Sequence, residues 1–183
     1  MTVPDLSIDD IGDLLAGAAD RPLLPSPTTS PSQLEHALQT AAVLRRQVPH
    51  DDELALAGLV HDVGHLLPGV SDAEHAGAGA AAVRRSLGER VAGLVGLHVE
   101  AKRYLVSGEP RYEAALAPDS VSSLALQGGP MSEAERVAFA ARLLAPDAVV
   151  LRRADESGKV DGLDVEGLEV WMAVLRRHRL RSG

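Results

Sequence analysis

An apolar stretch at residues 54–67 contains three polar side chains that such a stretch rarely holds: His61, Asp62 and His65. Its length and its content of alanine and leucine favour a buried helix over a strand. An ionised carboxylate in apolar surroundings is costly unless it is paired or bound to a metal. His65 follows His61 by four residues, so both would lie on one face of such a helix. We therefore predict a metal-binding helix, because a surface turn that contains His-Asp by chance fits the apolar flanks poorly.

The composition favours an all-α fold. Only 2% of the 183 residues are aromatic, so the core is built from alanine, leucine and valine. That composition is typical of closely packed helices rather than of a sandwich or barrel. The chain is long enough for one compact domain with a substantial core, and a single domain is the prediction.

Several classes of protein are disfavoured. A net charge of −8 argues against nucleic acid as a general partner, although a small anion remains compatible with local basic groups. The absence of cysteine excludes disulfides and thiolate metal sites. The first residues lack the pattern of a secretory signal, and no apolar stretch reaches membrane-spanning length. We therefore expect a cytoplasmic protein without membrane contact, and the sequence gives no signal of oligomeric state.

The segment 21–31 contains four prolines and is predicted to be a loop, because this density of proline excludes a helix. It is either a plain surface connection or a loop across the mouth of a site. The next helix is predicted to begin with Ser30 as its N-cap and Pro31 at its first position. His36 lies close to the apolar stripe of that helix, so we expect it to be at least partly buried.

Six residues form a candidate metal centre. His50 and His178 fit surface positions, which leaves five histidines, and Asp62 and Asp155 are the best-placed carboxylates. One catalytic ion must keep open positions for its substrate, so six protein ligands suit two ions better than one. Asp62 is the natural bridge because its neighbour His61 already binds. Ligands of this type favour iron, manganese or another first-row metal. The predicted set is His36, His61, Asp62, His75, His98 and Asp155.

Two resemblances sharpen this hypothesis. The order His36, His61-Asp62, Asp155 resembles the HD-domain superfamily, an all-helical metal-binding fold. A narrower resemblance is to the HD-domain mixed-valent di-iron oxygenases that cleave the carbon–phosphorus bond of 1-hydroxyphosphonates such as 2-amino-1-hydroxyethylphosphonate. Its most specific parts are Gln-Gly-Gly-Pro-Met and His-x-x-x-Lys, and the matching segments are 34–39, 61–67, 98–105, 123–131 and 151–155.

The narrower resemblance implies a single HD domain over residues 1–183. In it, residues 1–31 form an N-terminal helix and a proline-rich loop, 32–160 a metal-binding core around a dinuclear site, and 161–183 a C-terminal helix. It implies an Fe(II)/Fe(III) pair held by the six ligands above, dioxygen as co-substrate and release of phosphate from a small anionic, phosphonate-like substrate.

The resemblance also implies roles around the metals. His65 is expected to be a catalytic group beside the metals, outside the ligand set. Lys102 lies one turn after His98 and is expected to be both catalytic and a cation for a phosphonate oxygen. Further substrate-binding residues are expected to be Ser123, Gln127 and Arg152. For Lys102 and Arg152 the alternative is an ordinary solvated charge.

The sequence departs from the family pattern near the substrate. These oxygenases carry a tyrosine and a glutamate just before the first ligand helix, whereas residues 25–30 contain neither. His75 is followed by alanine instead of the usual glutamate, and Ala154 replaces an aromatic residue. In the family, the glutamate before the first ligand helix would hold an ammonium group of the substrate. Its absence here favours a phosphonate without an amine, or another hydroxylated acid.

Two further functions are compatible with the same ligands. An HD phosphohydrolase would use a metal-bound hydroxide on a phosphoester and would need no dioxygen. A binding protein that retained the ligands but lost the lid would bind small anions without turnover.

Overall fold

The structure is a computed structural model that describes residues 3–23 and 31–182; residues 1–2, 24–30 and 183 lie outside it. Within the described ranges the chain forms helices and no β-strand, which confirms the all-α prediction. No helix there is both long enough and apolar enough to cross a membrane. The elements are α1 (Ile8–Ala16), α2 (Gln33–Gln47), α3 (Asp52–Val60), η1 (Val63–Leu66), α4 (His75–Gly108), α5 (Pro110–Ala114), α6 (Pro118–Leu126), α7 (Glu133–Ala140), α8 (Ala145–Ser157) and α9 (Leu168–Ser182).

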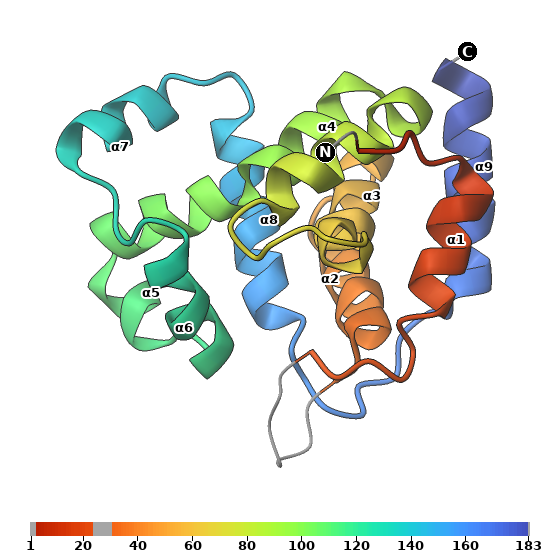
Figure 1. The fold of residues 1–183 in the computed structure, drawn as a ribbon, viewed down its shortest axis with the longest axis horizontal. Coiled ribbons are helices and arrows are strands. Elements are labelled where there is room, and N and C mark those ends of the chain that lie inside the picture. The colour runs from red at the N-terminus through yellow and green to blue at the C-terminus, as the bar shows by residue number, and fades with distance from the viewer. Residues whose placement is uncertain (1–2, 24–30, 183) are drawn as a thin grey trace.

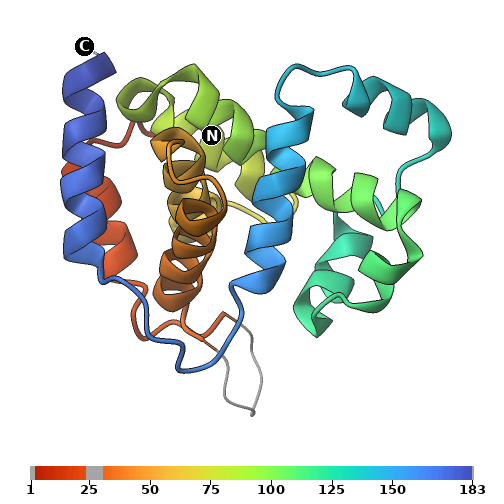
Figure 2. The same cartoon turned by 180° about the vertical axis from the view of Figure 1, so that it is seen from behind.

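Helices α2, α3, α4 and α8 form the centre of the bundle (Figure 1). Helices α1 and α9 pack together on one side of it, and α5, α6 and α7 lie on the opposite side, as the reverse view also shows (Figure 2). The main hydrophobic cluster consists mostly of alanine, leucine and valine and draws on both the centre and the α1–α9 side. This continuity supports the proposed single domain, whose division at residues 31 and 160 stays a prediction.

The N-terminus of α2 differs from the prediction. The N-cap is Ser32, whose hydroxyl accepts from the backbone of Glu35 while the Glu35 carboxylate accepts from the backbone of Ser32. The predicted cap at Ser30 is therefore wrong by two residues, because the capping box closes on a glutamate rather than on Gln33. Residues 24–30 of the predicted loop, 21–31, lie outside the described residues, and both interpretations of this loop stay predictions.

The stretch 54–67 is not one helix, which corrects the first prediction. Helix α3 ends at Val60, Asp62 has φ −99° and ψ 7°, and a 3₁₀ turn follows from residue 63 to residue 66. On a continuous helix, adjacent side chains point about 100° apart. The break lets the neighbours His61 and Asp62 face the same point, whereas His65 lies beside them on the turn and not on a shared helical face.

Helix α4 is bent between two halves. Gly88 has φ 85° at the bend, a conformation that glycine adopts without strain. His75 begins the first half and His98 lies in the second half, so the bend brings the two imidazoles within reach of one another.

Candidate metal centre

All six predicted ligands converge at the centre of the bundle. Helix α2 supplies His36, the break after α3 supplies His61 and Asp62, α4 supplies His75 and His98, and α8 supplies Asp155. The five residues other than Asp62 are buried. The imidazoles form two close pairs, with an Nε2–Nε2 distance of 3.2 Å between His36 and His61 and of 3.0 Å between His75 and His98.

Each imidazole is oriented by the main chain. The Nδ1 atom of His36 donates to the carbonyl oxygen of Gly158 at 2.8 Å, and that of His61 donates to Gly58 at 2.8 Å. In the second pair, Nδ1 of His98 donates to the Val95 carbonyl at 2.7 Å, and Nδ1 of His75 donates to the carbonyl of residue 72. A carbonyl oxygen can only accept, so the proton sits on Nδ1 and leaves a lone pair on Nε2.

This geometry fits metal ions. Within each pair, two Nε2 lone pairs face each other at about hydrogen-bond distance, an arrangement that is repulsive without a positive charge between them. Metal–nitrogen bonds of about 2.1 Å to adjacent coordination positions place two nitrogens roughly 3 Å apart, as seen in both pairs. In a histidine that binds metal through one ring nitrogen, the other ring nitrogen usually donates a hydrogen bond, often to a backbone carbonyl oxygen.

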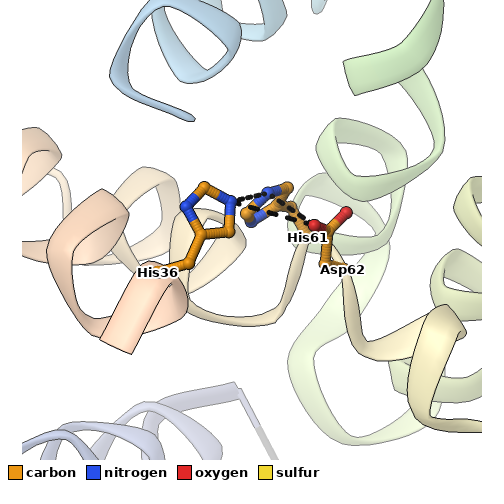
Figure 3. A group of neighbouring side chains, drawn as sticks. All are labelled: His36, His61 and Asp62. Carbon is orange, nitrogen blue, oxygen red and sulfur yellow. Dashed lines mark hydrogen bonds and ion pairs between the residues drawn. The ribbon is translucent and has the colours of Figure 1, made fainter. Parts of the chain in front are cut away.

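Asp62 connects the two pairs. Its Oδ2 lies 3.4 Å from Nε2 of His61 and 3.8 Å from that of His36, and Figure 3 shows these three side chains pointing toward one another. Its Oδ1 lies 3.5 Å from Nε2 of His98 and 3.6 Å from that of His75. One carboxylate oxygen therefore faces each pair, which is the arrangement of a carboxylate that bridges two ions.

Asp155 completes the first half of the centre. Its Oδ1 lies 3.3 Å from Nε2 of His36 and 3.7 Å from Nε2 of His61. Its other oxygen accepts from Arg152, so the carboxylate is held with one oxygen toward the imidazoles. Burial alone would raise the pKa of the Asp155 carboxyl, but Arg152 and Lys159 outweigh it and hold the pKa well below its usual range.

The pKa values of the imidazoles are shifted in the directions expected for a site that holds a cation. Burial lowers the pKa of His98 to about 3 and also lowers that of His75, so both are neutral and able to bind metal at pH 7. Burial acts in the same direction on His61, but Asp62 and Asp155 outweigh it and raise its pKa to about 9. The metal-free site therefore attracts a proton to the place where a metal ion would supply the positive charge.

A cavity of about 750 Å³ opens beside the centre. The predicted substrate residues line it, together with the metal-facing side chains of Asp62, His75, His98 and Asp155. Lys102 is 5% exposed and its Nζ donates to Oγ of Ser123 at 2.8 Å. The cavity is lined by the predicted catalytic residue His65 and by the predicted substrate-binding residues Lys102, Ser123, Gln127 and Arg152.

Arg152 has a second function that the sequence does not reveal. Besides Asp155, its guanidinium donates to the Tyr112 hydroxyl at 2.8 Å, to Ser120 Oγ at 2.9 Å and to the Glu156 carboxylate. Most of its donors are thus engaged by protein, and they fix the orientation of Asp155. Its direct contact with substrate stays a prediction.

Two charged residues on the cavity wall are absent from the sequence-based prediction. Lys159 donates to Ser120 Oγ at 2.9 Å and adds a second lysine to the cavity. The sequence could have indicated Lys159, because it follows the predicted ligand Asp155 by four residues, as Lys102 follows His98. Asp72 lies 3.8 Å from Nε2 of His65 and gave no signal, because it stands in a loop without periodicity.

Known proteins are similar to this chain over most of its length. The model of the myo-inositol oxygenase family matches residues 6–90. Hydroxymethylphosphonate dioxygenase of Gimesia maris is 37% identical over 149 residues, which cover 76% of this chain and 74% of that protein. The chain belongs to the phosphonate dioxygenase family. A second member, the glycine-betaine-forming [1-hydroxy-2-(trimethylamino)ethyl]phosphonate dioxygenase of Leisingera caerulea, is 31% identical over 93% of this chain and 92% of its own.

Membership of the phosphonate dioxygenase family makes this protein an oxygenase and confirms the predicted resemblance. A more distant likeness is confined to a short segment: inositol oxygenase 1 of Arabidopsis thaliana is 46% identical over 41 residues, or 22% of this chain and 13% of that protein. Two kinds of oxygenase are thus similar to the part of the chain around the first ligands.

Proposed function

We propose that this protein is a di-iron oxygenase that cleaves the carbon–phosphorus bond of a small hydroxyphosphonate and releases phosphate. The observation that carries the proposal is the division of the ligands into two halves with Asp62 between them, beside a cavity that contains two lysines. His36, His61 and Asp155 would hold one iron, His75 and His98 the other, and Asp62 would bridge. An Fe(II)/Fe(III) pair with dioxygen would supply the oxidising power.

The cavity residues would bind and orient the substrate. The Lys102 ammonium has three N–H donors and gives one of them to Ser123, which leaves donors that suit the oxygens of a phosphonate. Lys159 adds positive charge on the α8 side, and His65 stacks on His75 with ring centroids 3.8 Å apart. The substrate hydroxyl would then face the metals from the side that the protein ligands leave open.

Iron loading under anaerobic conditions, followed by partial oxidation, tests this function. We expect two irons per chain, a mixed-valent electron paramagnetic resonance signal that a hydroxyphosphonate perturbs, and phosphate release that requires dioxygen. A protein that never holds two irons would contradict the proposal. Phosphate release from phosphomonoesters under argon would indicate a phosphohydrolase instead, and tight binding without oxygen uptake would indicate a binding protein.

Lys102→Ala is expected to retain both metals and to weaken binding of a hydroxyphosphonate by roughly tenfold to a hundredfold, because a charge-assisted hydrogen bond is lost. Metal analysis and calorimetric titration check the two parts. Arg85→Ala, which removes an exposed cation on α4, is the matched control and should change neither. Loss of iron from Lys102→Ala would show that its role was wrongly assigned.

The binding of a phosphonate should depend on pH through the same lysine. Burial lowers the pKa of Lys102 to about 8, with the charges of Arg152 and Lys159 adding to the effect. The ammonium is therefore present below pH 8 and lost above it, so affinity should fall as the pH rises through about 8. Lys102→Arg keeps its charge at these pH values and should show a flatter profile over the same range. Identical profiles for the two proteins would contradict this assignment.

A further inference from the structure

The cavity contains a carboxylate that belongs neither to the six predicted ligands nor to the predicted substrate-binding residues. Asp72 lies in the loop between η1 and α4, and its side chain is 37% exposed. Among the described residues, no lysine or arginine forms an ion pair with it. Its Oδ1 lies 3.8 Å from Nε2 of His65, which is too long for a hydrogen bond, so this oxygen keeps its capacity to accept.

Gln127 adds a second acceptor beside this carboxylate. Its Nε2 donates to Oδ2 of Asp72 at 3.2 Å, and this contact fixes the amide, because the opposite orientation would set oxygen against oxygen. The amide oxygen, Oε1, is buried and has no hydrogen-bond partner in the part of the chain that the structure describes. A buried acceptor without a donor is costly, so its presence in a cavity-lining residue points to a ligand.

The two acceptors lie close to the predicted phosphonate site. Ser123, which binds Lys102, and Gln127, which binds Asp72, are four residues apart at the end of α6. Four residues of helix span about 6 Å. The cavity therefore has a cationic end and an anionic end at a separation that one small zwitterion can bridge.

We propose that Asp72 and Gln127 determine specificity by binding an N–H donor, such as a primary ammonium group, at the substrate carbon next to the hydroxylated one. This inference rests on the proposed function and differs from the expectation that the missing glutamate favours a phosphonate without an amine. Two hydrogen-bond acceptors suit a primary ammonium, which has N–H donors, and not a trimethylammonium, which has none. Trimethylammonium groups are instead bound by tryptophan, tyrosine or phenylalanine, and none of these lines the cavity in the described part of the chain.

The test compares three 1-hydroxyphosphonates with the iron-loaded protein: one with a primary ammonium at C2, one with a trimethylammonium there, and 1-hydroxyethylphosphonate. Affinities are measured anaerobically by calorimetry, and phosphate release is measured in air. We expect the primary ammonium compound to be preferred over the other two by roughly tenfold or more in both measurements.

Asp72→Asn keeps an oxygen for Gln127 but removes the charge. We expect it to lower the ratio between the primary ammonium compound and 1-hydroxyethylphosphonate by about tenfold. A ratio taken within one protein cancels any general loss of activity. Asp13→Asn, which removes an equal charge from an exposed position on α1, is the matched control and should leave the ratio unchanged.

The outcomes separate this inference from the function it rests on. The inference would be overturned if the wild type preferred 1-hydroxyethylphosphonate or the trimethylammonium compound. It would also be overturned if the ratio between the primary ammonium compound and 1-hydroxyethylphosphonate were equal in wild type and Asp72→Asn. In either case, oxygen-dependent phosphate release would still support the proposed function. If none of the three compounds were turned over, phosphate release from other hydroxyphosphonates would test the function, and the anaerobic affinity ratios would still decide the role of Asp72.

Discussion

Asp62→Ala is expected to lose both metal ions, whereas His98→Ala is expected to lose only one. Asp62 directs one oxygen toward His36 and His61 and the other toward His75 and His98, so its removal takes a ligand from each half. His98 contributes to a single half, and its partner Nε2 lies 3.0 Å away on His75. Iron per chain, measured after gel filtration by mass spectrometry, should fall from two to near zero and to about one, respectively.

His50→Ala is the matched control for this pair, because His50 is exposed and takes no part in the centre. It should retain two irons. If Asp62→Ala and His98→Ala lost the same amount of iron, the two halves would not be independent and the bridging role of Asp62 would be refuted.

Gly64→Ala is expected to displace His75 and to destabilise the fold. A Cβ at this position would overlap the carbonyl group of His75, and the obstacle is main chain rather than a flexible side-chain end. Overpacking of this kind costs about 1–3 kcal/mol, which lowers the melting temperature of a chain of this size by a few to roughly 10 °C. We also expect the iron bound by His75 and His98 to be lost, with the other iron retained.

Gly77→Ala makes the same chemical change where nothing lies within 4 Å of the added Cβ. Because alanine favours a helix over glycine, this variant should be as stable as the wild type or slightly more stable, with both irons present. Thermal unfolding and iron content of the two variants, measured side by side, check the prediction. Equal stabilities would show that the contact between Gly64 and His75 is not tight.

The convergence of the six side chains could be predicted because residue types in the sequence indicate metal-binding chemistry, and their role as ligands stays a prediction. A buried His-Asp pair, a histidine near the stripe of the preceding helix and a later aspartate are visible without coordinates, and the structure brings them together. The break at His61 and Asp62 could not be predicted, since the apolar run around it is equally compatible with a continuous helix.

The cavity wall was less predictable than the metal centre. Asp72 stands in a loop, and its approach to Gln127 joins residues 55 positions apart in the chain. Arg152 was recognised as a cation near Asp155, but only its contacts with Tyr112 and Ser120 show that it orients that ligand. Pairings of this kind depend on how helices pack, which a pattern along one segment does not encode.

The main-chain contacts of the imidazoles have a consequence for how such an enzyme can diverge. Residue 72 offers its carbonyl oxygen to His75 and its side chain to the cavity, and residue 95 likewise orients His98 through a carbonyl. Every amino acid supplies a carbonyl, so substitution at these places need not disturb the ring that each one orients. Substrate preference can therefore drift over generations by exchange of residues that stand directly beside the ligands, while the chemistry they support is inherited unchanged.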